Sequence, residues 1–298
     1  MRYRVAILLL LLTFAGFAQL GNTITKSDFN FGHQLGYMYS RMDSAAFRPA
    51  GEWSFETGFL AYYTSSMPQV TNPGYRERLM LLVPLNFEVA VSDWVALQVK
   101  ATDLFVEFPY ESIHNVGGKS PMFCAKMGLL REGPLHPALA LTCGVKFSSA
   151  KPYTIWAKKH NYVESNGLAG ADTGVADYLL LFTATRHFLE QWAVDARLGL
   201  APLGSPVEYV RGSGQADEIP YGLRFRFSPS PLYGLAAEVS GMKNGLSGTR
   251  LAHYSVARLT GSRSFGRLET SLDLEKGLTR ESDEWVAGTY LKFNLGKE

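Results

Sequence analysis

The stretch LALTCGVKF (residues 139–147) alternates apolar and polar side chains at a period of two. The stretches WSFETGF (residues 53–59) and YGLRFRF (residues 221–227) follow the same pattern. Successive side chains of a β-strand point to opposite faces, so each stretch predicts a strand with one apolar face and one polar face. The apolar face requires lipid or a protein core, and the polar face requires water or mutual pairing.

Twelve segments of this kind follow one another along the chain. We predict strands over residues 52–63, 78–91, 94–105, 122–130, 138–148, 177–186, 192–201, 219–228, 232–241, 250–259, 266–276 and 284–295. The connections after the even-numbered strands are short, whereas residues 64–76, 106–121, 149–176 and 202–218 form longer connections after odd-numbered strands. Short periplasmic turns that alternate with longer outer loops are typical of bacterial outer-membrane barrels. The sequence therefore predicts an all-β fold, a transmembrane antiparallel β-barrel of about 12 strands over residues 52–298.

A chain of this length could also form one or two soluble all-β domains. The start of the chain favours the membrane, because residues 1–18 have the organisation of a secretory signal peptide. Arg2 and Arg4 form a basic start, residues 5–12 form an apolar run too short to cross a bilayer, and Gly16-Phe17-Ala18 fits a cleavage site. No apolar run of about 18 residues follows. Only helices and closed barrels satisfy every backbone group in lipid, so the outer membrane is the predicted location.

The net charge excludes one class of partner. The chain has 29 basic and 27 acidic residues, and removing Arg2 and Arg4 with the signal peptide leaves 27 of each. A protein near neutrality has no strong field for nucleic acid. We expect its partners to be outer-membrane lipid, the barrel-assembly machinery during biogenesis, and a small-molecule solute.

Three features depart from the regular pattern. Residues 19–51 match no strand and are predicted to form a periplasmic or lumenal segment, most simply a partly ordered tail. The alternation is lost around residues 102–107, which predicts a bulge or an early end of the third strand. Arg258 shares the phase of Tyr254 and Val256, which would turn it toward lipid, and a cation there is tolerated only at an interface.

The alternation also assigns faces to the other residues. Cys124 shares its phase with Lys126, whereas Cys143 shares its phase with Leu141 and Val145, so the two Cβ vectors diverge and we expect both thiols to be free. The residues expected to contact lipid are Trp53, Phe59, Leu141, Val145, Leu198 and Phe225.

The polar phase gathers charges of both signs in the predicted lumen. The predicted lumen-lining residues are Glu52, Glu56, Arg78, Glu88, Gln98, Lys100, Lys126, Lys146, Asp195, Arg197, Arg224, Arg226, Glu238, Arg267, Glu269, Asp273, Glu275 and Lys292. Twelve strands lie between small filled barrels and open porins, so these charges either pair with one another or line a narrow polar path. Most of the basic residues come from strands four to eight and most of the acidic ones from strands one, nine and eleven. This separation predicts a transverse field that favours zwitterionic or dipolar solutes.

Motifs for catalysis are sparse. The sequence contains no phosphate-binding loop and no clustered metal-ligand set, so we expect no catalytic residue, metal or cofactor. His253 and Ser255 resemble the His-x-Ser arrangement of outer-membrane phospholipase A, but the eleventh strand has no Asn to orient the histidine. Residues 151–162 mix cations with aromatic side chains, which leaves a structural or adhesive role of the outer loops as a further alternative.

Five stretches in the middle of the chain are distinctive: KMGLLRE (residues 126–132), PALALTCGVKF (residues 137–147), DTGVADY (residues 172–178), LGLAPLGSP (residues 198–206) and YGL (residues 221–223). They are similar to a group of bacterial outer-membrane barrels of the meta-pathway phenol-degradation transporter type. The resemblance implies an outer-membrane barrel that moves small hydrophobic compounds. Together with the mixed charge of the lumen, it predicts a passive transporter or narrow channel for small hydrophobic or zwitterionic compounds, and no enzyme.

Overall fold

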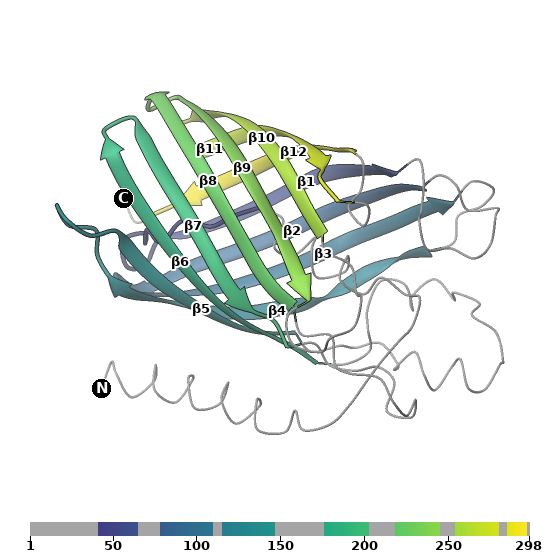
Figure 1. Ribbon diagram of the computed structural model, residues 1–298, viewed down its shortest axis with the longest axis horizontal. Helices are drawn as coiled ribbons and strands as arrows, with labels where there is room; N and C mark the ends of the chain where they lie inside the picture. The colour runs from purple at the N-terminus through teal and green to yellow at the C-terminus, as the bar shows by residue number, and fades with distance from the viewer. Residues whose placement is uncertain are drawn as a thin grey trace.

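In the computed structural model, twelve antiparallel strands form one closed barrel whose strands are tilted to its axis (Figure 1). The structure describes residues 41–64, 78–109, 115–146, 176–202, 218–244, 254–279 and 285–296; residues 64, 78–80, 102–109, 115–120, 177, 244 and 254 are described by their backbone alone. The strands are β1 (Trp53–Thr64), β2 (Arg78–Ser92), β3 (Val95–Pro109), β4 (Asn115–Leu130), β5 (Ala138–Lys146), β6 (Asp177–Leu189), β7 (Trp192–Leu200), β8 (Glu218–Ser230), β9 (Tyr233–Asn244), β10 (Tyr254–Phe265), β11 (Leu268–Gly277) and β12 (Trp285–Leu295). Within these ranges, no helix is long and apolar enough to cross a bilayer.

The barrel closes through the pairing of its first and last strands. Trp53 lies opposite Leu295 and Tyr63 lies opposite Trp285, with an unbroken register between them. Each strand therefore has two neighbours, and no edge is left with unpaired backbone groups. This arrangement confirms the predicted twelve-stranded antiparallel barrel.

Several predicted strand ends were wrong. β3 continues to Pro109 and β4 begins at Asn115, so most of the predicted loop over residues 106–121 is strand. The register of the β3–β4 pair shifts on both sides of Thr102, which confirms the expected bulge and explains how the strand continues after its alternation is lost. β10 also continues to Phe265, and the turn to β11 falls at Gly266, whose φ of +62° suits glycine.

The outer face of the barrel is apolar. Large exposed side chains are Phe59, Phe87, Leu97, Phe123, Phe182, Leu198, Phe225, Leu235, Leu259, Leu272 and Leu291, contributed by eleven of the strands. Trp53 and Tyr63 are both exposed and stand ten residues apart on β1, which is about 33 Å along a strand. With a tilt of about 40°, this separation corresponds to a band of about 25 Å, the height of the apolar band of a transmembrane barrel.

The expected lipid-facing residues follow this outer phase. Trp53, Phe59, Leu198 and Phe225 are exposed, whereas Leu141 and Val145 are half-buried on the same face of β5. Leu198 is 60 % exposed and stands six residues after Trp192 on β7, which is about 20 Å along the strand.

Replacing Leu198 with arginine should lower the free energy of unfolding by about 2–4 kcal/mol, the cost of a cation near the midplane of the lipid face. Urea unfolding in liposomes measures the change, and Leu198→Met, which conserves volume, should unfold like the wild type. An unchanged unfolding midpoint for Leu198→Arg would place this side chain outside the hydrocarbon region.

Both cysteines are free, as predicted. Cys124 lies opposite Gly144, and Cys143 lies opposite Ala125, one position out of phase. Both side chains are buried. The period-two alternation keeps the two sulfurs on different faces of the β4–β5 pair.

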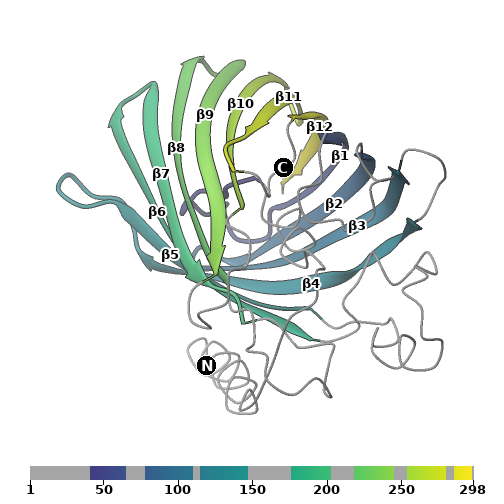
Figure 2. The same cartoon turned by 45° about the vertical axis from the view of Figure 1, so that its right-hand side comes forward.

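Residues 41–52, the lumenal strap, precede β1 and run through the barrel interior (Figure 2). The strap ends at the β2–β3 turn, where Ala50 N donates to Asp93 Oδ1 at 3.2 Å and Gly51 N donates to Ala90 O at 2.7 Å. Gly51 has a φ of +89°, which L side chains rarely adopt, and this conformation leads the chain from the strap into β1. The predicted N-terminal segment, residues 19–51, thus enters the barrel over residues 41–51, and residues 19–40 lie outside the described residues.

Candidate functional site

The interior is polar, and its charges form two clusters on neighbouring parts of the wall, the first on β7 and β8 and the second on β9, β10 and β11. On the first wall, Asp195 of β7 is fully buried and accepts hydrogen bonds from Arg224 Nε at 2.8 Å and Arg226 Nε at 2.7 Å. Thr185 Oγ1 donates to the same carboxylate at 2.7 Å. The arginines stand two apart on β8, so they point inward together, and one carboxylate joins them.

On the second wall, Arg258 of β10 lies between two glutamates because of the strand register. Glu238 of β9 and Glu275 of β11 are the residues opposite Arg258 on its two sides. Arg258 Nη1 lies 3.2 Å from Glu238 Oε1, and Nη2 lies 2.7 Å from Glu275 Oε1. All three side chains are buried. The prediction that Arg258 faces lipid was therefore wrong, because the apolar neighbour that set its phase, Val256, is also buried on the inner face.

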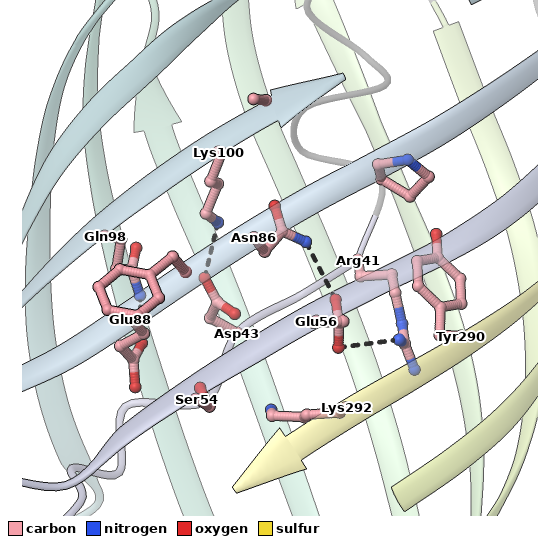
Figure 3. Close-up of a pocket in the computed structure, with 13 residues that line it drawn as sticks. Arg41, Asp43, Ser54, Glu56, Asn86, Glu88, Gln98, Lys100, Tyr290 and Lys292 are labelled. Atoms are coloured by element: carbon pink, nitrogen blue, oxygen red, sulfur yellow. Dashed lines mark hydrogen bonds and ion pairs between the residues drawn. The ribbon is translucent and has the colours of Figure 1, made fainter. Parts of the chain in front are cut away.

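The lumenal strap meets this acidic wall through Arg41. Its Nη1 lies 3.2 Å from Glu56 Oε2, its Nε lies 3.4 Å from Asp273 Oδ2, and its Nη2 donates to Ser271 Oγ at 3.1 Å. The guanidinium carbon also lies 4.1 Å from the centre of the Tyr290 ring, a cation–π geometry. Figure 3 shows Arg41 between Glu56 of β1 and Tyr290 of β12.

The next residues of the strap meet the other walls. Lys100 Nζ donates to Asp43 Oδ2 at 2.8 Å, and Lys126 Nζ donates to Ala46 O at 2.7 Å (Figure 3 shows the first pair). Arg48 pairs with Glu88 at 3.4 Å. The strap therefore presents a cation to the acidic wall and, two residues later, an anion to a lysine of β3.

The strap backbone is held by the barrel as well. Met42 N donates to Glu238 Oε2 at 3.3 Å, and Arg224 Nη1 donates to Met42 O. Ala45 N donates to Thr185 Oγ1 at 2.7 Å. Gly222 leaves room for this approach, since a Cβ there would lie 2.7 Å from the Met42 sulfur. The strap thus follows a defined path through the interior.

A polar hollow of about 710 Å³, which includes the part open to solvent, lies between the strap and the walls formed by β1, β2, β3 and β12 (Figure 3). The side chains around it carry both signs of charge and several neutral polar groups. Its lining residues are Arg41, Asp43, Ser54, Glu56, Pro84, Asn86, Phe87, Glu88, Gln98, Lys100, Ala101, Tyr290 and Lys292. Asn86 Nδ2 donates to Glu56 Oε1 at 3.0 Å, and Gln98 Nε2 donates to Glu88 Oε2 at 2.5 Å, so part of the lining is fixed by its own hydrogen bonds.

Most of the predicted lumen residues are enclosed by the barrel. Buried or half-buried side chains are Glu52, Glu56, Glu88, Gln98, Lys100, Lys126, Lys146, Asp195, Arg197, Arg224, Arg226, Glu238, Glu269, Asp273, Glu275 and Lys292. Arg267 is exposed in the β10–β11 turn, and the Arg78 side chain lies outside the described residues. That these residues line a transport path remains a prediction.

Sequence reasoning missed Arg41, Asp43 and Arg258. Arg258 had a usable signal, because acidic residues occupy the inner phase of β9 and β11 on both sides of it. The strap residues had none beyond their charges, since residues 41–52 carry no periodicity.

The alternative functions rest mostly on residues outside the described part of the chain. His253 and residues 151–162 lie there, while Ser255 is buried in β10. Within the described ranges, no group of three or more His, Cys, Asp or Glu side chains is placed to hold a metal ion.

An apolar exterior and a charged interior on a closed twelve-stranded barrel define an outer-membrane β-barrel. The solved structure of an outer-membrane channel from Pseudomonas putida F1 is similar, with a TM-score of 0.65 and 13 % sequence identity over 86 % of this chain and 100 % of that chain. The NanC porin (TM-score 0.48, 5 % identity, 83 % of this chain and 100 % of that chain) and the transport unit of the autotransporter AIDA-I from Escherichia coli (TM-score 0.47, 8 % identity, 92 % and 100 %) are also similar. No protein-family model and no curated protein matches the sequence. The first structure confirms, at the level of the fold, the resemblance to outer-membrane transporter barrels.

Proposed function

We propose that the protein is a passive channel of the outer membrane for small polar solutes without net charge. The observation that carries the proposal is the polar hollow inside the barrel, which is lined by the cations Arg41, Lys100 and Lys292 and by the anions Asp43, Glu56 and Glu88. A solute with both signs of charge finds partners on such a lining, whereas a simple ion meets repulsion from half of it. The similar barrel from Pseudomonas putida F1 is itself an outer-membrane channel, which supports the proposal.

The lining favours zwitterionic or dipolar compounds over hydrophobic ones. Pro84, Phe87 and Ala101 are its apolar members besides the ring of Tyr290. A hydrophobic solute in the hollow would remove water from charged side chains without giving them hydrogen bonds, which is costly. We further propose that residues 1–18 are removed on export, so that the channel begins at Gln19.

Electrical recording tests the proposal. Purified protein in a planar bilayer should give discrete single-channel steps, and a salt gradient should give a reversal potential close to zero because the lining carries both signs. In proteoliposomes, glycine betaine should enter faster than sodium acetate at equal osmolarity. Protein that is folded by heat-modifiable gel mobility, yet gives neither current nor solute entry, would rule out the channel.

A further inference from the structure

We infer that Arg41 and Asp43 of the lumenal strap occupy the two ends of a solute site, and that this site takes a small zwitterion with a guanidinium or ammonium head and a carboxylate. The inference rests on the proposed channel function and names its solute class. Without solute, the side chains of Arg41 and Asp43 therefore occupy the site themselves, and a bound solute replaces them.

The cationic end is built around the Arg41 guanidinium. Two carboxylates, a hydroxyl and an aromatic ring face it: Glu56 at 3.2 Å, Asp273 at 3.4 Å, Ser271 at 3.1 Å and Tyr290 at 4.1 Å. Carboxylates with an aromatic face are the groups that recognise organic cations in proteins. This end of the site therefore selects a nitrogen cation.

Asp273 of the acidic wall lies closer to the cation of the strap than to the cation of the strands. Glu238, Asp273 and Glu275 surround Arg258, and Asp273 is fully buried. Among the described residues, neither oxygen of Asp273 accepts a hydrogen bond, and the distance from Asp273 Oδ2 to Arg258 Nε is 3.9 Å, longer than to Arg41. Buried carboxylates without a counter-charge are strongly unfavourable. If Arg41 withdraws, another cationic head is needed in its place.

The anionic end lies beside Lys100. Its ammonium holds Asp43 Oδ2 at 2.8 Å, and the Asp43 side chain is 42 % exposed, so this carboxylate stands at the margin of the hollow. Lys292 lines the same hollow. A solute carboxylate can therefore reach the lysine from the hollow.

The two ends face one continuous space. Arg41 and Asp43 are separated by one residue, and both line the hollow together with their partners Glu56 and Lys100 (Figure 3). A solute already in the hollow thus lies next to both ion pairs. The two strap side chains compete with the solute at an effective concentration on the order of millimolar, because they are tethered to the barrel. Removing their charges should therefore increase the affinity for the solute.

The experiment measures binding of 4-guanidinobutyrate to the folded full-length protein in detergent by titration calorimetry. The variant R41Q/D43N keeps the strap and removes its two charges, and it should bind the compound on the order of tenfold more tightly than the wild type, because the tethered competitor is gone. Butylguanidinium and butyrate, which each carry one head, should bind more weakly than 4-guanidinobutyrate. The control R131Q/E190Q removes one cation and one anion from exposed turn positions and should bind like the wild type.

A second variant keeps the test decisive. Adding Glu56→Gln and Lys100→Gln to R41Q/D43N should abolish the gained binding, because the wall partners are lost. If R41Q/D43N does not fold, R41Q and D43N are titrated singly, and each should gain part of the affinity.

Two results would overturn the site: equal affinity of the wild type and the strap variant, or equal affinity for the zwitterion and its one-headed analogues. Binding does not depend on conduction, so the two proposals fail separately. Zwitterion binding without current refutes the channel and keeps the site, while current without zwitterion binding refutes the site and keeps the channel.

Discussion

Replacing Arg258 with methionine should lower the free energy of unfolding of the barrel by about 3–5 kcal/mol, because it removes one partner of a buried ion cluster and leaves the others. Glu238 and Glu275 would lose contacts of 3.2 Å and 2.7 Å, and all three side chains are almost inaccessible to solvent. Urea unfolding in liposomes, followed by tryptophan fluorescence, measures the change.

The matched control removes the arginine together with both of its glutamate partners. In R258M/E238Q/E275Q no glutamate is left charged without its arginine, and this variant should recover most of the lost stability, as buried ion clusters replaced by neutral residues often do. A single R258M variant as stable as the wild type would show that the cluster is open to water in the folded protein.

Reversing Arg224 and Arg226 together should shift the ion selectivity of the channel toward cations. The pair R224E/R226E replaces two cations with two anions beside Asp195, so three carboxylates would meet where one now accepts both arginines. The cation-to-anion permeability ratio should rise on the order of tenfold, since a pore wall of one sign concentrates its counter-ions. Reversal potentials in a salt gradient measure it.

The lysine pair R224K/R226K preserves both charges and should keep the selectivity of the wild type. Identical reversal potentials for the wild type and R224E/R226E would exclude a conducting path along this part of β8. The reversed pair should also weaken the barrel, because Asp195 would lose its counter-charges.

The strands were predictable because membrane barrels impose a simple local rule. Phe225 is exposed, whereas its neighbours Arg224 and Arg226 form ion pairs inside the barrel. Because lipid lies outside and polar groups lie inside, apolar and polar residues alternate along each strand, and this alternation is visible in the sequence. The same rule failed where an apolar side chain faces inward. Val256 is buried on the inner face of β10, and because it is apolar, its phase was wrongly assigned to lipid together with that of Arg258.

Of the candidate site, only the residues on the barrel strands were predictable from the sequence. Glu56, Lys100 and Asp273 follow from strand phase, whereas their partners Arg41 and Asp43 belong to a segment without regular structure. The position of such a segment depends on contacts between residues far apart in sequence, and no local pattern encodes them. The bulge at Thr102 was visible as lost alternation, but its effect, a longer strand, depends on pairing with β4.

The contacts of the strap also imply an order in which parts of the barrel form. Arg41 hydrogen-bonds to Ser271, 230 positions later in the chain, and its other partners include Asp273 and the ring of Tyr290 on the last two strands. Contacts between such distant residues form late in folding. Before β11 and β12 have paired, Glu56 is the only one of these partners that Arg41 can contact. The strap therefore reaches its final position only after the barrel has closed. A truncated chain that lacks β11 and β12 would leave the strap without these contacts and should therefore be cleaved by added protease more readily than the full-length protein.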